Sequence, residues 1–329
     1  MGTLTHLKTE NQAGQLTRRT FLGAAAGILG LAVGARGARA ESMPIIDTHI
    51  HLFDPRRPQG VPWPPKDDAI LYKPALPDRY REVTKGLGIV GAIEIECSNW
   101  LEDNQWVLDV ASTDTIIVGT VGDLEPGKPG FRQHLDRFHK NPLFRGIRYG
   151  NLWGRNFSDD ITKPLFISDL QALADADLEL DTAMPNPVLI AALVRLTDAV
   201  PNLRIVIDHM LQLELPAERG QLQANLQELA KRPHVYVKAS EVARWDRGET
   251  SDDLNFYRPR LDALWDIFGA DKLMYGSDWP NSDHWAAYPK VLNLVREYVS
   301  SKGPEAAEKF FWKNSIAAYH WVKRAANQP

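Results

Sequence analysis

The chain of 329 residues is 44% hydrophobic and 24% charged, and its formal net charge is −4. This is the composition of a globular protein, and it excludes a disordered chain, a fibrous protein and a membrane protein with several spans. No strongly basic surface is implied, so nucleic acid is not an expected partner. Cys97 is the only cysteine, which excludes an intrachain disulfide and a cysteine-rich zinc site.

Residues 1–40 have the pattern of an export signal. Arg18 and Arg19 precede the apolar run 21–34, which is shorter than the roughly 20 residues that a membrane span requires. Small residues around Ala40 are typical of a processing site. The segment resembles a twin-arginine signal peptide, which the twin-arginine export machinery reads. We therefore expect cleavage near Ala40, a periplasmic or secreted protein and no stable membrane anchor; an uncleaved anchor is the alternative.

Residues 41–329 alternate short apolar runs with helical patterns. The predicted strands are Pro44–His49, Ile89–Ile95, Thr115–Val121, Phe144–Tyr149, Leu178–Thr182, Leu203–His209, Val235–Ala239 and Lys272–Gly276. The clearest helical periodicities are Leu165–Ala176, Val188–Val200, Leu222–Lys231 and Leu261–Phe268. Eight strand–helix units with strands apolar on both faces predict one α/β domain, a distorted (β/α)8 TIM barrel. A doubly wound open sheet is the alternative, disfavoured because no glycine-rich phosphate loop follows the first strand.

Two further segments stand out in this pattern. The connection between the first two predicted strands is long, rich in proline and contains Trp63. Barrels place substrate lids on the strand-to-helix side, so we expect a lid here, with a passive surface loop as the alternative. At the end of the chain, Pro304–Arg324 is amphipathic and predicts one closing helix that packs against the barrel.

The candidate chemistry lies where the apolar runs stop. His49 and His51 are separated by one residue, so on a strand their side chains point to the same side. The sixth run ends in His209, and Asp278 follows the eighth. Because the carboxyl ends of parallel barrel strands meet at one mouth, we expect these four side chains to lie together.

Protonation chemistry suggests a role for each of the four. Asp278 is the candidate general base that takes a proton from water. His209 would polarise a substrate carbonyl or hold a metal ion. His49 and His51 would hold the metal ion, or bind the developing oxyanion directly if no metal is present.

Three motifs carry a resemblance to a known family: IDTHIHLFDP at 46–55, VIDH at 206–209 and LMYGSDWP at 273–280. They resemble the amidohydrolase superfamily, and more narrowly its branch of sugar-lactone and dicarboxylate-lactone hydrolases. The resemblance implies a distorted (β/α)8 barrel that hydrolyses a lactone ring without a covalent intermediate. It places the catalytic and metal-binding residues of the family on His49, His51, His209 and Asp278.

The sequence departs from the binuclear members of that superfamily. Those members carry a bridging lysine or glutamate after strand four and a histidine after strand five, whereas here the strands end with Arg148-Tyr149 and Thr182-Ala183. A two-metal site is therefore not expected. One divalent ion, zinc or manganese, or no required metal at all, both stay open.

Four residues are candidates for substrate binding. Arg148 and Lys238 could neutralise a substrate carboxylate, Trp279 could offer an aromatic face, and His284 could reach the mouth. Salt bridging inside the barrel is the alternative for both cations, with Glu94 and Glu96 as possible partners. The roles of Glu94, Glu96 and Asp181 are not determined by the sequence.

The function that we expect is opening of the lactone ring of a sugar acid or a related carboxylic acid, by a water that Asp278 activates. One alternative keeps the fold but is a metal-dependent decarboxylase of an aromatic or unsaturated acid. A non-enzymatic solute-binding barrel is the other, disfavoured because a binding protein has no need of three histidines and an aspartate at its mouth. In every case the expected partner is a small molecule.

Overall fold

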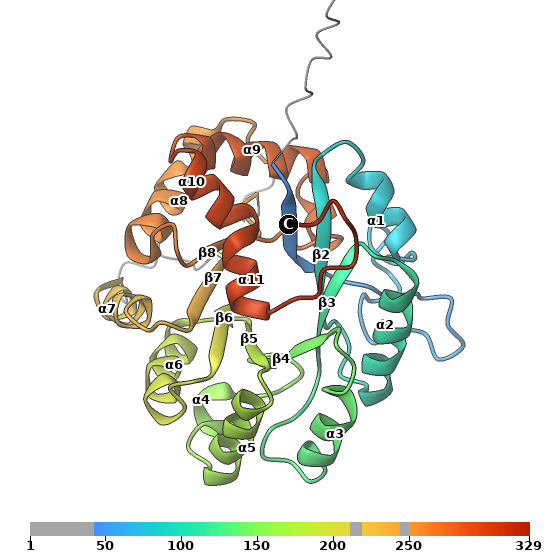
Figure 1. Cartoon of the computed structure of the whole chain (residues 1–329), viewed down its shortest axis with the longest axis vertical. Coiled ribbons are helices and arrows are strands. Elements are labelled where there is room, and N and C mark those ends of the chain that lie inside the picture. The colour runs from blue at the N-terminus through green and yellow to red at the C-terminus, as the bar shows by residue number, and fades with distance from the viewer. Residues whose placement is uncertain (1–42, 211–218, 244–249) are drawn as a thin grey trace, which may run out of the picture. The chain divides into compact units, whose positions relative to one another are not determined.

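The computed structural model describes residues 43–210, 219–243 and 250–329; the predicted signal segment 1–40 lies outside them. The described chain forms one sheet of eight parallel strands in sequential order (Figure 1). The strands are β1 (Ile45–Ile50), β2 (Ile89–Ile95), β3 (Ile117–Gly122), β4 (Phe144–Gly150), β5 (Glu179–Ala183), β6 (Arg204–Ile207), β7 (Val235–Ala239) and β8 (Leu273–Tyr275). The predicted (β/α)8 barrel is confirmed.

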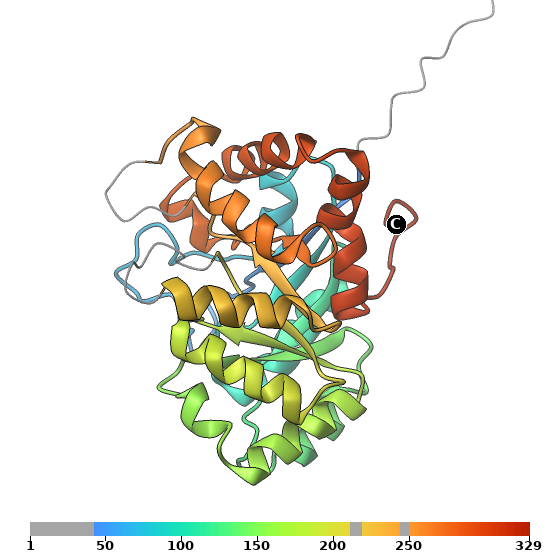
Figure 2. The same ribbon diagram turned by 90° about the vertical axis from the view of Figure 1, so that its left-hand side faces the viewer.

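Helices surround the sheet and connect its strands (Figures 1 and 2). They are α1 (Pro77–Val83), α2 (Leu101–Thr113), α3 (Phe131–Phe138), α4 (Phe157–Asp160), α5 (Pro164–Asp175), α6 (Pro187–Ala199), α7 (Arg219–Ala230), α8 (Leu254–Phe268) and α9 (Tyr288–Ser300), with a short 3-10 helix η1 (Asn281–His284). Helix α8 begins seven residues before the predicted Leu261, because the side chain of Asp253 caps its first turn by accepting from the amide of Asn255 (2.9 Å). Within the described residues, no helix is both long and apolar enough to cross a bilayer.

The strands are apolar on both faces because they separate two cores. The inner core fills the barrel with residues such as Ile46, Ile93, Val118 and Met274. The outer core is larger and lies between the strands and the ring of helices. This double burial explains why continuous apolar runs, and not alternating ones, marked the strands in the sequence.

The first and last strands close the barrel. The amide of Asp278 donates to the carbonyl of His49 (2.8 Å), and the amide of His51 donates to the carbonyl of Trp279 (2.8 Å). A single parallel bridge joins Ile50 to Trp279. The two ends of the sequence that carry the strongest motifs are therefore hydrogen-bonded neighbours.

The C-terminal segment differs from its prediction. It is helical only to residue 319, as α10 (Pro304–Glu308), a π turn η2 (Lys309–Lys313) and α11 (Asn314–Tyr319), and His320 turns left-handed at φ 49°. The single helix predicted to extend to Arg324 was wrong beyond this point. Arg204 donates to the carbonyl of Ala318 (2.8 Å), so tertiary hydrogen bonds take up the last carbonyls of the helix. Helix α11 lies at the end of the barrel opposite the strand-to-helix loops (Figure 2).

The long loop between β1 and α1 is attached at both ends. Phe53 and Ala75 exchange backbone hydrogen bonds of 3.0 and 2.9 Å. Asp68, near its middle, pairs with His284 of η1 (3.0 Å). These contacts hold the loop beside the carboxyl ends of β1 and β8.

Candidate active site

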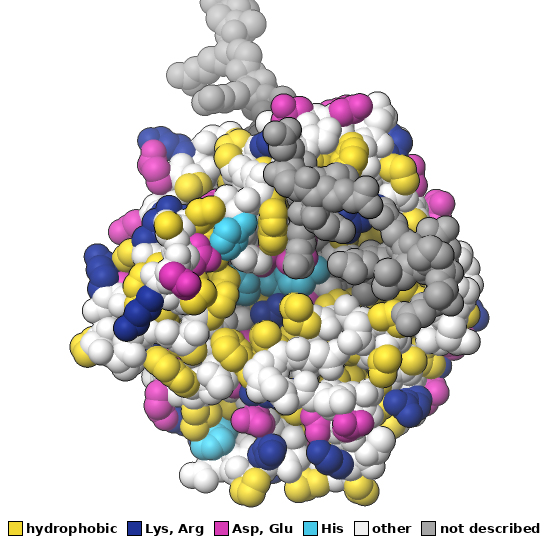
Figure 3. All heavy atoms as spheres, turned by 180° about the vertical axis from the view of Figure 1, so that it is seen from behind, with side chains coloured by type: hydrophobic (Ala, Val, Ile, Leu, Met, Phe, Trp, Pro, Cys, Tyr) yellow, Lys and Arg dark blue, Asp and Glu magenta, His cyan; other side chains and the backbone are white. Residues whose placement is uncertain are grey.

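The four residues predicted to gather do so at the mouth of the barrel. Nε2 of His51 lies 3.2 Å from Oδ1 of Asp278, and Nε2 of His49 lies 3.5 Å from the same oxygen. The rings of His49 and His209 have centroids 4.6 Å apart. Histidine side chains are visible in a hollow on this face of the molecule (Figure 3).

Strained backbone marks the same rim. Four non-glycine residues just beyond the ends of β5 to β8 have left-handed backbone: Met184 (φ 50°), His209 (φ 63°), Glu241 (φ 55°) and Asp278 (φ 60°). Such conformations cost of order 1–3 kcal/mol each and are retained chiefly at functional sites. Two of the four are the residues singled out from the sequence at the ends of strands six and eight.

Asp278 is buried, and its two oxygens have different surroundings. Oδ1 faces the two imidazoles, whereas Oδ2 accepts a hydrogen bond from the side chain of Asn281 (2.7 Å). Burial acts to raise the pKa of Asp278, but the hydrogen bond with His51 and the nearby imidazole charges outweigh it and lower the pKa below its ordinary value. Asp278 is therefore a carboxylate over the whole physiological range.

The hydrogen bonds of His51 leave a place for a cation. Its Nδ1 must donate to the carbonyl of Ile95 (2.8 Å), because that oxygen only accepts. In the neutral ring Nε2 is then an acceptor, and it faces Oδ1 of Asp278, a second acceptor. Two acceptors at 3.2 Å are compatible only if a proton or a metal ion lies between them.

His49 has an unused nitrogen at the same point. Its ring is fully buried and Nε2 has no hydrogen-bond partner among the described residues. Nδ1 lies 3.2 Å from Nζ of Lys238 and 3.4 Å from Oδ1 of Asp208. Burial and the charge of Lys238 lower the pKa of His49 well below its ordinary value, so the ring is neutral, as metal ligation requires.

These residues fit a divalent metal ion by their chemistry. Ligand atoms of His49, His51 and Asp278 lie within 4.8 Å of one another, and those of His209, Glu241 and Asp278 form a second such group. Two imidazoles and a carboxylate are ligands that zinc and manganese accept. Ligation through Nε2 requires the proton of His49 on Nδ1, where Oδ1 of Asp208 (3.4 Å) would accept it in the usual carboxylate–histidine–metal arrangement. The other tautomer, in which Nδ1 accepts from the ammonium of Lys238 (3.2 Å), would place the proton on Nε2.

Lys238 occupies the barrel interior and not the substrate side. It is fully buried, and its Nζ donates to Asp181 and to Oδ1 of Asp208 (2.9 Å) besides contacting His49. Burial lowers the pKa of this ammonium, but the two carboxylates outweigh that effect and raise it. The structure leaves Lys238 no surface for a substrate carboxylate, and the alternative of salt bridging inside the barrel describes its contacts.

Arg148 connects the buried group of Lys238, Asp181 and Asp208 to the mouth of the barrel. Its Nε donates to Oδ2 of Asp208 (2.8 Å), and Nη1 donates to the carbonyl of Glu96 (3.3 Å). Nη2 lies 3.5 Å from Nε2 of His209, whose Nδ1 bonds the hydroxyl of Ser240 (2.9 Å). Because a guanidinium only donates, Nε2 of His209 is an acceptor and its proton lies on Nδ1.

Trp279 and His284 lie beside the site rather than in it. The ring of Trp279 is completely buried, with its centroid 5.3 Å from that of Tyr80. This leaves no face for a substrate, contrary to the contact we expected. His284 is partly exposed and both its nitrogens are engaged, with the carbonyl of Asn281 and with Asp68.

Three residues of the site were missed by the sequence analysis. Asp208 links Lys238, Arg148 and His49; Ser240 orients His209; and Glu241 lies close to His209 and Asp278. Lys238 and Arg148, together with His49, lower the pKa of Asp208 well below its ordinary value although burial acts to raise it. One signal was present in the sequence. Each of the three lies one or two residues beyond the end of β6 or β7, where His209 and Lys238 were already candidates.

Three proteins with known names align with most of this chain. A relative named L-fucono-1,5-lactonase from Burkholderia ambifaria is 28% identical over 290 residues, which is 86% of this chain and 98% of that protein. An amidohydrolase from Burkholderia multivorans, solved with bound zinc, has a TM-score of 0.75 at 23% identity and covers 84% of this chain and 99% of its own. The 5-carboxyvanillate decarboxylase of Novosphingobium aromaticivorans, solved with manganese, has a TM-score of 0.60 at 18% identity, covering 85% and 97%.

The two solved structures are too distant in sequence to show more than the shared barrel fold. The family assignment is independent of them. The amidohydrolase family model matches residues 46–321, a span that includes all four predicted residues of the mouth. The chain therefore belongs to the amidohydrolase family of enzymes.

Proposed function

We propose that the protein opens the lactone ring of a sugar acid by direct attack of water. The observation that carries the proposal is the convergence of two histidine nitrogens on one oxygen of an ionised aspartate at the barrel mouth. The name of the Burkholderia ambifaria relative, L-fucono-1,5-lactonase, supports the substrate class. The expected product is the open-chain hydroxy acid, and acid release from L-fucono-1,5-lactone and related lactones in a pH-indicator assay tests the proposal.

Each residue of the mouth has a role in the proposed reaction. Asp278 accepts a proton from the attacking water while the water oxygen bonds to the carbonyl carbon. The negative charge that develops on the carbonyl oxygen is stabilised by the guanidinium of Arg148 beside His209. When the bond between the carbonyl carbon and the ring oxygen breaks, Asp278 returns the proton to that oxygen, so all atoms and charges balance.

His49, His51 and Asp278 would hold a single divalent ion. When bound, such an ion lowers the pKa of water and polarises a carbonyl, which compensates for the weak basicity of a carboxylate with a lowered pKa. The chain's own contribution is to keep His49 neutral and to aim the Nε2 atoms of both histidines at Asp278.

Metal binding gives the first testable prediction. Chelator-treated protein should bind one equivalent of zinc in calorimetry, and the ion should raise the thermal unfolding temperature. His51→Gln should lose this binding, because it removes the Nε2 atom that faces Asp278. His284→Gln, a change at a histidine outside the group, is the matched control and should bind zinc as wild type does. Equal binding by His51→Gln would contradict the assignment of the ion to this group.

Decarboxylation of an aromatic or unsaturated acid is the alternative, since a manganese-containing decarboxylase shares the fold. The two reactions differ in what they release. Lactone opening produces one carboxylic acid and no gas, whereas decarboxylation produces CO2 and consumes a proton. Parallel assays for acid and for CO2 with lactones and with substituted benzoates therefore distinguish them.

We also propose that the twin-arginine pattern at residues 17–40 directs export of the folded protein. Replacing Arg18 and Arg19 together by lysine should retain the protein in the cytoplasm in its uncleaved form, because the export receptor reads the arginine pair rather than its charge. Cell fractionation and the mass of the mature chain measure the outcome. Arg36→Lys, in the same segment but outside the pair, is the control. Export of the double variant at the wild-type level would refute the proposal.

A further inference from the structure

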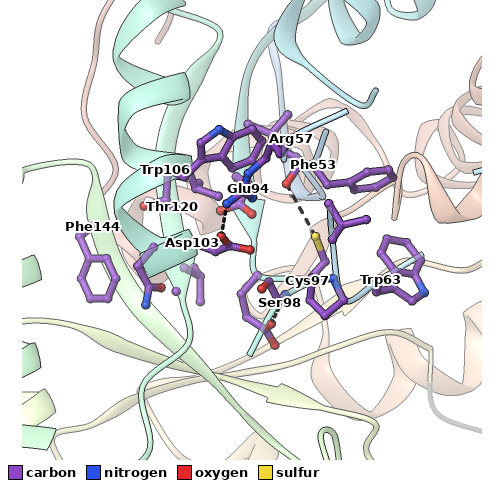
Figure 4. Close-up of a pocket in the computed structure, with 18 residues that line it drawn as sticks. Phe53, Arg57, Trp63, Glu94, Cys97, Ser98, Asp103, Trp106, Thr120 and Phe144 are labelled. Atoms are coloured by element: carbon purple, nitrogen blue, oxygen red, sulfur yellow. Dashed lines mark hydrogen bonds and ion pairs between the residues drawn. The ribbon is translucent and has the colours of Figure 1, made fainter. Parts of the chain in front are cut away.

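A cleft lies on the outer side of β2 and β3, beneath α2 and the loop that follows β1 (Figure 4). It contains about 430 Å³ of empty space, including its open mouth. Ile93 and Ile95 belong to the inner core, so Glu94 between them points outward into this cleft. Trp63 and Phe144 lie at its opposite ends in Figure 4, with Glu94 between them.

The cleft adjoins the catalytic mouth through one of its walls. Trp63 lines the cleft, and its ring centroid lies 5.5 Å from that of His51 in an edge-to-face contact. Leu52 and Phe53, which follow His51 directly, line it as well. Leu52, Phe53 and Trp63 therefore line the cleft on the side that faces His51.

Glu94 offers an unused hydrogen-bonding group to the cleft. Its side chain is buried, with 1% of the residue exposed, and Oε1 has no partner among the described residues. Burial raises the pKa of Glu94 well above its ordinary value, and the negative charge of Glu96 acts in the same direction. Both effects favour the protonated carboxyl, whose O–H is a hydrogen-bond donor. A buried donor without an acceptor is unfavourable, so an acceptor atom is expected opposite it.

The remaining charges of the cleft do not favour an anion. The guanidinium of Arg57 is paired with Asp103 (2.5 Å), and it lies 4.5 Å from the centroid of the Trp106 ring. Glu96 adds a carboxyl to the same lining. A carboxylate group would enter without a cation of its own, and burial of an unpaired charge is strongly unfavourable. Aromatic walls with one free donor suit instead a small uncharged group that carries a hydroxyl.

We propose that this cleft is a specificity subsite that holds an uncharged hydroxymethyl substituent of the lactone ring, with Glu94 donating a hydrogen bond to its oxygen. The assignment rests on the proposed lactone hydrolysis for the placement of the ring. It adds that the substrates are neutral sugar lactones, and that lactones carrying a carboxylate at this carbon are rejected. Glu94 is accordingly a binding residue and takes no part in bond breaking.

The test uses 1,5-lactams, stable analogues in which the ring oxygen is replaced by NH, so that binding is measured without turnover. Three lactams share the hydroxylated ring of galactonolactone and differ only in the exocyclic group, which is hydroxymethyl, hydrogen or carboxylate. In calorimetry, wild type should bind the hydroxymethyl lactam about tenfold more tightly than the hydrogen lactam. It should bind the carboxylate lactam more weakly than either.

Two variants identify the cleft as the source of this preference. Glu94→Leu removes the donor, and Val107→Phe on α2 fills the space; each should reduce the hydroxymethyl preference to less than about threefold. Glu94→Gln keeps the size and an N–H donor and should retain the preference, which also controls for folding. A wild-type protein that binds the lactams alike, or binds none, overturns the proposal, as does a preference that survives both substitutions. If the preference is present and no lactone is hydrolysed, the subsite stands and the proposed reaction is wrong.

Discussion

Asp278→Asn should lower kcat by at least about a thousandfold while the protein folds as wild type does. An amide has nearly the same shape as the carboxylate and can still accept the hydrogen bond from Asn281, but it cannot take a proton from water. General-base catalysis by a positioned side chain is worth about 10²–10⁴-fold, and the loss of charge beside His49 and His51 adds to it. Steady-state kinetics with the best lactone, together with circular dichroism, measure both parts of the prediction.

Asp283→Asn is the matched control for this variant. Asp283 is a carboxylate five residues farther along the chain that pairs with Arg79 (2.8 Å) and does not belong to the metal-binding groups of the described residues. Its loss should change kcat by less than about threefold, because its carboxylate is paired with Arg79 and lies outside the group of His49, His51 and Asp278. If Asp278→Asn kept more than a tenth of the wild-type activity, Asp278 would not be the base.

Lys238→Met should be the most destabilising single substitution at the site, with a loss of about 3–5 kcal/mol in the free energy of unfolding. The ammonium is fully buried and lies between Asp181 and Asp208, which are themselves fully buried. Methionine has a similar length but leaves Asp181 without its cation and leaves Asp208 with Arg148 alone. Urea unfolding at neutral pH measures the loss, and a chain that no longer folds is the extreme form of the same result.

The pH dependence of this deficit separates lost charge pairing from lost packing. Burial raises the pKa of Asp181 to about 6 even with Lys238 present, and removal of the ammonium raises it further. A carboxyl with a raised pKa in the folded state stabilises the protein at low pH and ceases to do so as the pH rises through that value. The deficit of Lys238→Met should therefore shrink between pH 8 and pH 5.

Lys163→Met is the control for the lysine substitution. Lys163 pairs with Asp160 (2.7 Å), but its side chain is 62% exposed, and its loss should not measurably alter unfolding. A pH-independent deficit in Lys238→Met would show that packing, and not the buried charges, explains the loss.

The strands and the family could be predicted because their signals are local. Strands β2 and β7 begin and end at the predicted residues, since a strand that is buried on both faces is a continuous apolar run. The end of the final helix could not be predicted in this way. Its amphipathic pattern continues past Tyr319, but the hydrogen bond that Arg204 makes to the carbonyl of Ala318 depends on a distant strand.

The gathering of His49, His51, His209 and Asp278 was also predictable, because parallel strands bring their carboxyl ends to one mouth. The partners of the buried charged side chains could not be predicted. Lys238 and Arg148 could each have faced a substrate or an internal carboxylate. Which of the two they contact depends on which acidic residues of neighbouring strands lie at the same level along the barrel axis. Asp208, which accepts from both, became recognisable only in the folded barrel.

The amino-acid sequence by itself determined the barrel, the amidohydrolase family and the identity of the four residues at its mouth, because apolar runs and short motifs are properties of neighbouring residues. Only the tertiary structure decided that Lys238 and Trp279 are interior residues, that Asp208 connects the charged network, and that Glu94 points outward into a cleft. The physical reason is that side chains from other strands determine the partner of a buried polar group. No local sequence pattern specifies how high along the barrel those side chains lie or which way they point.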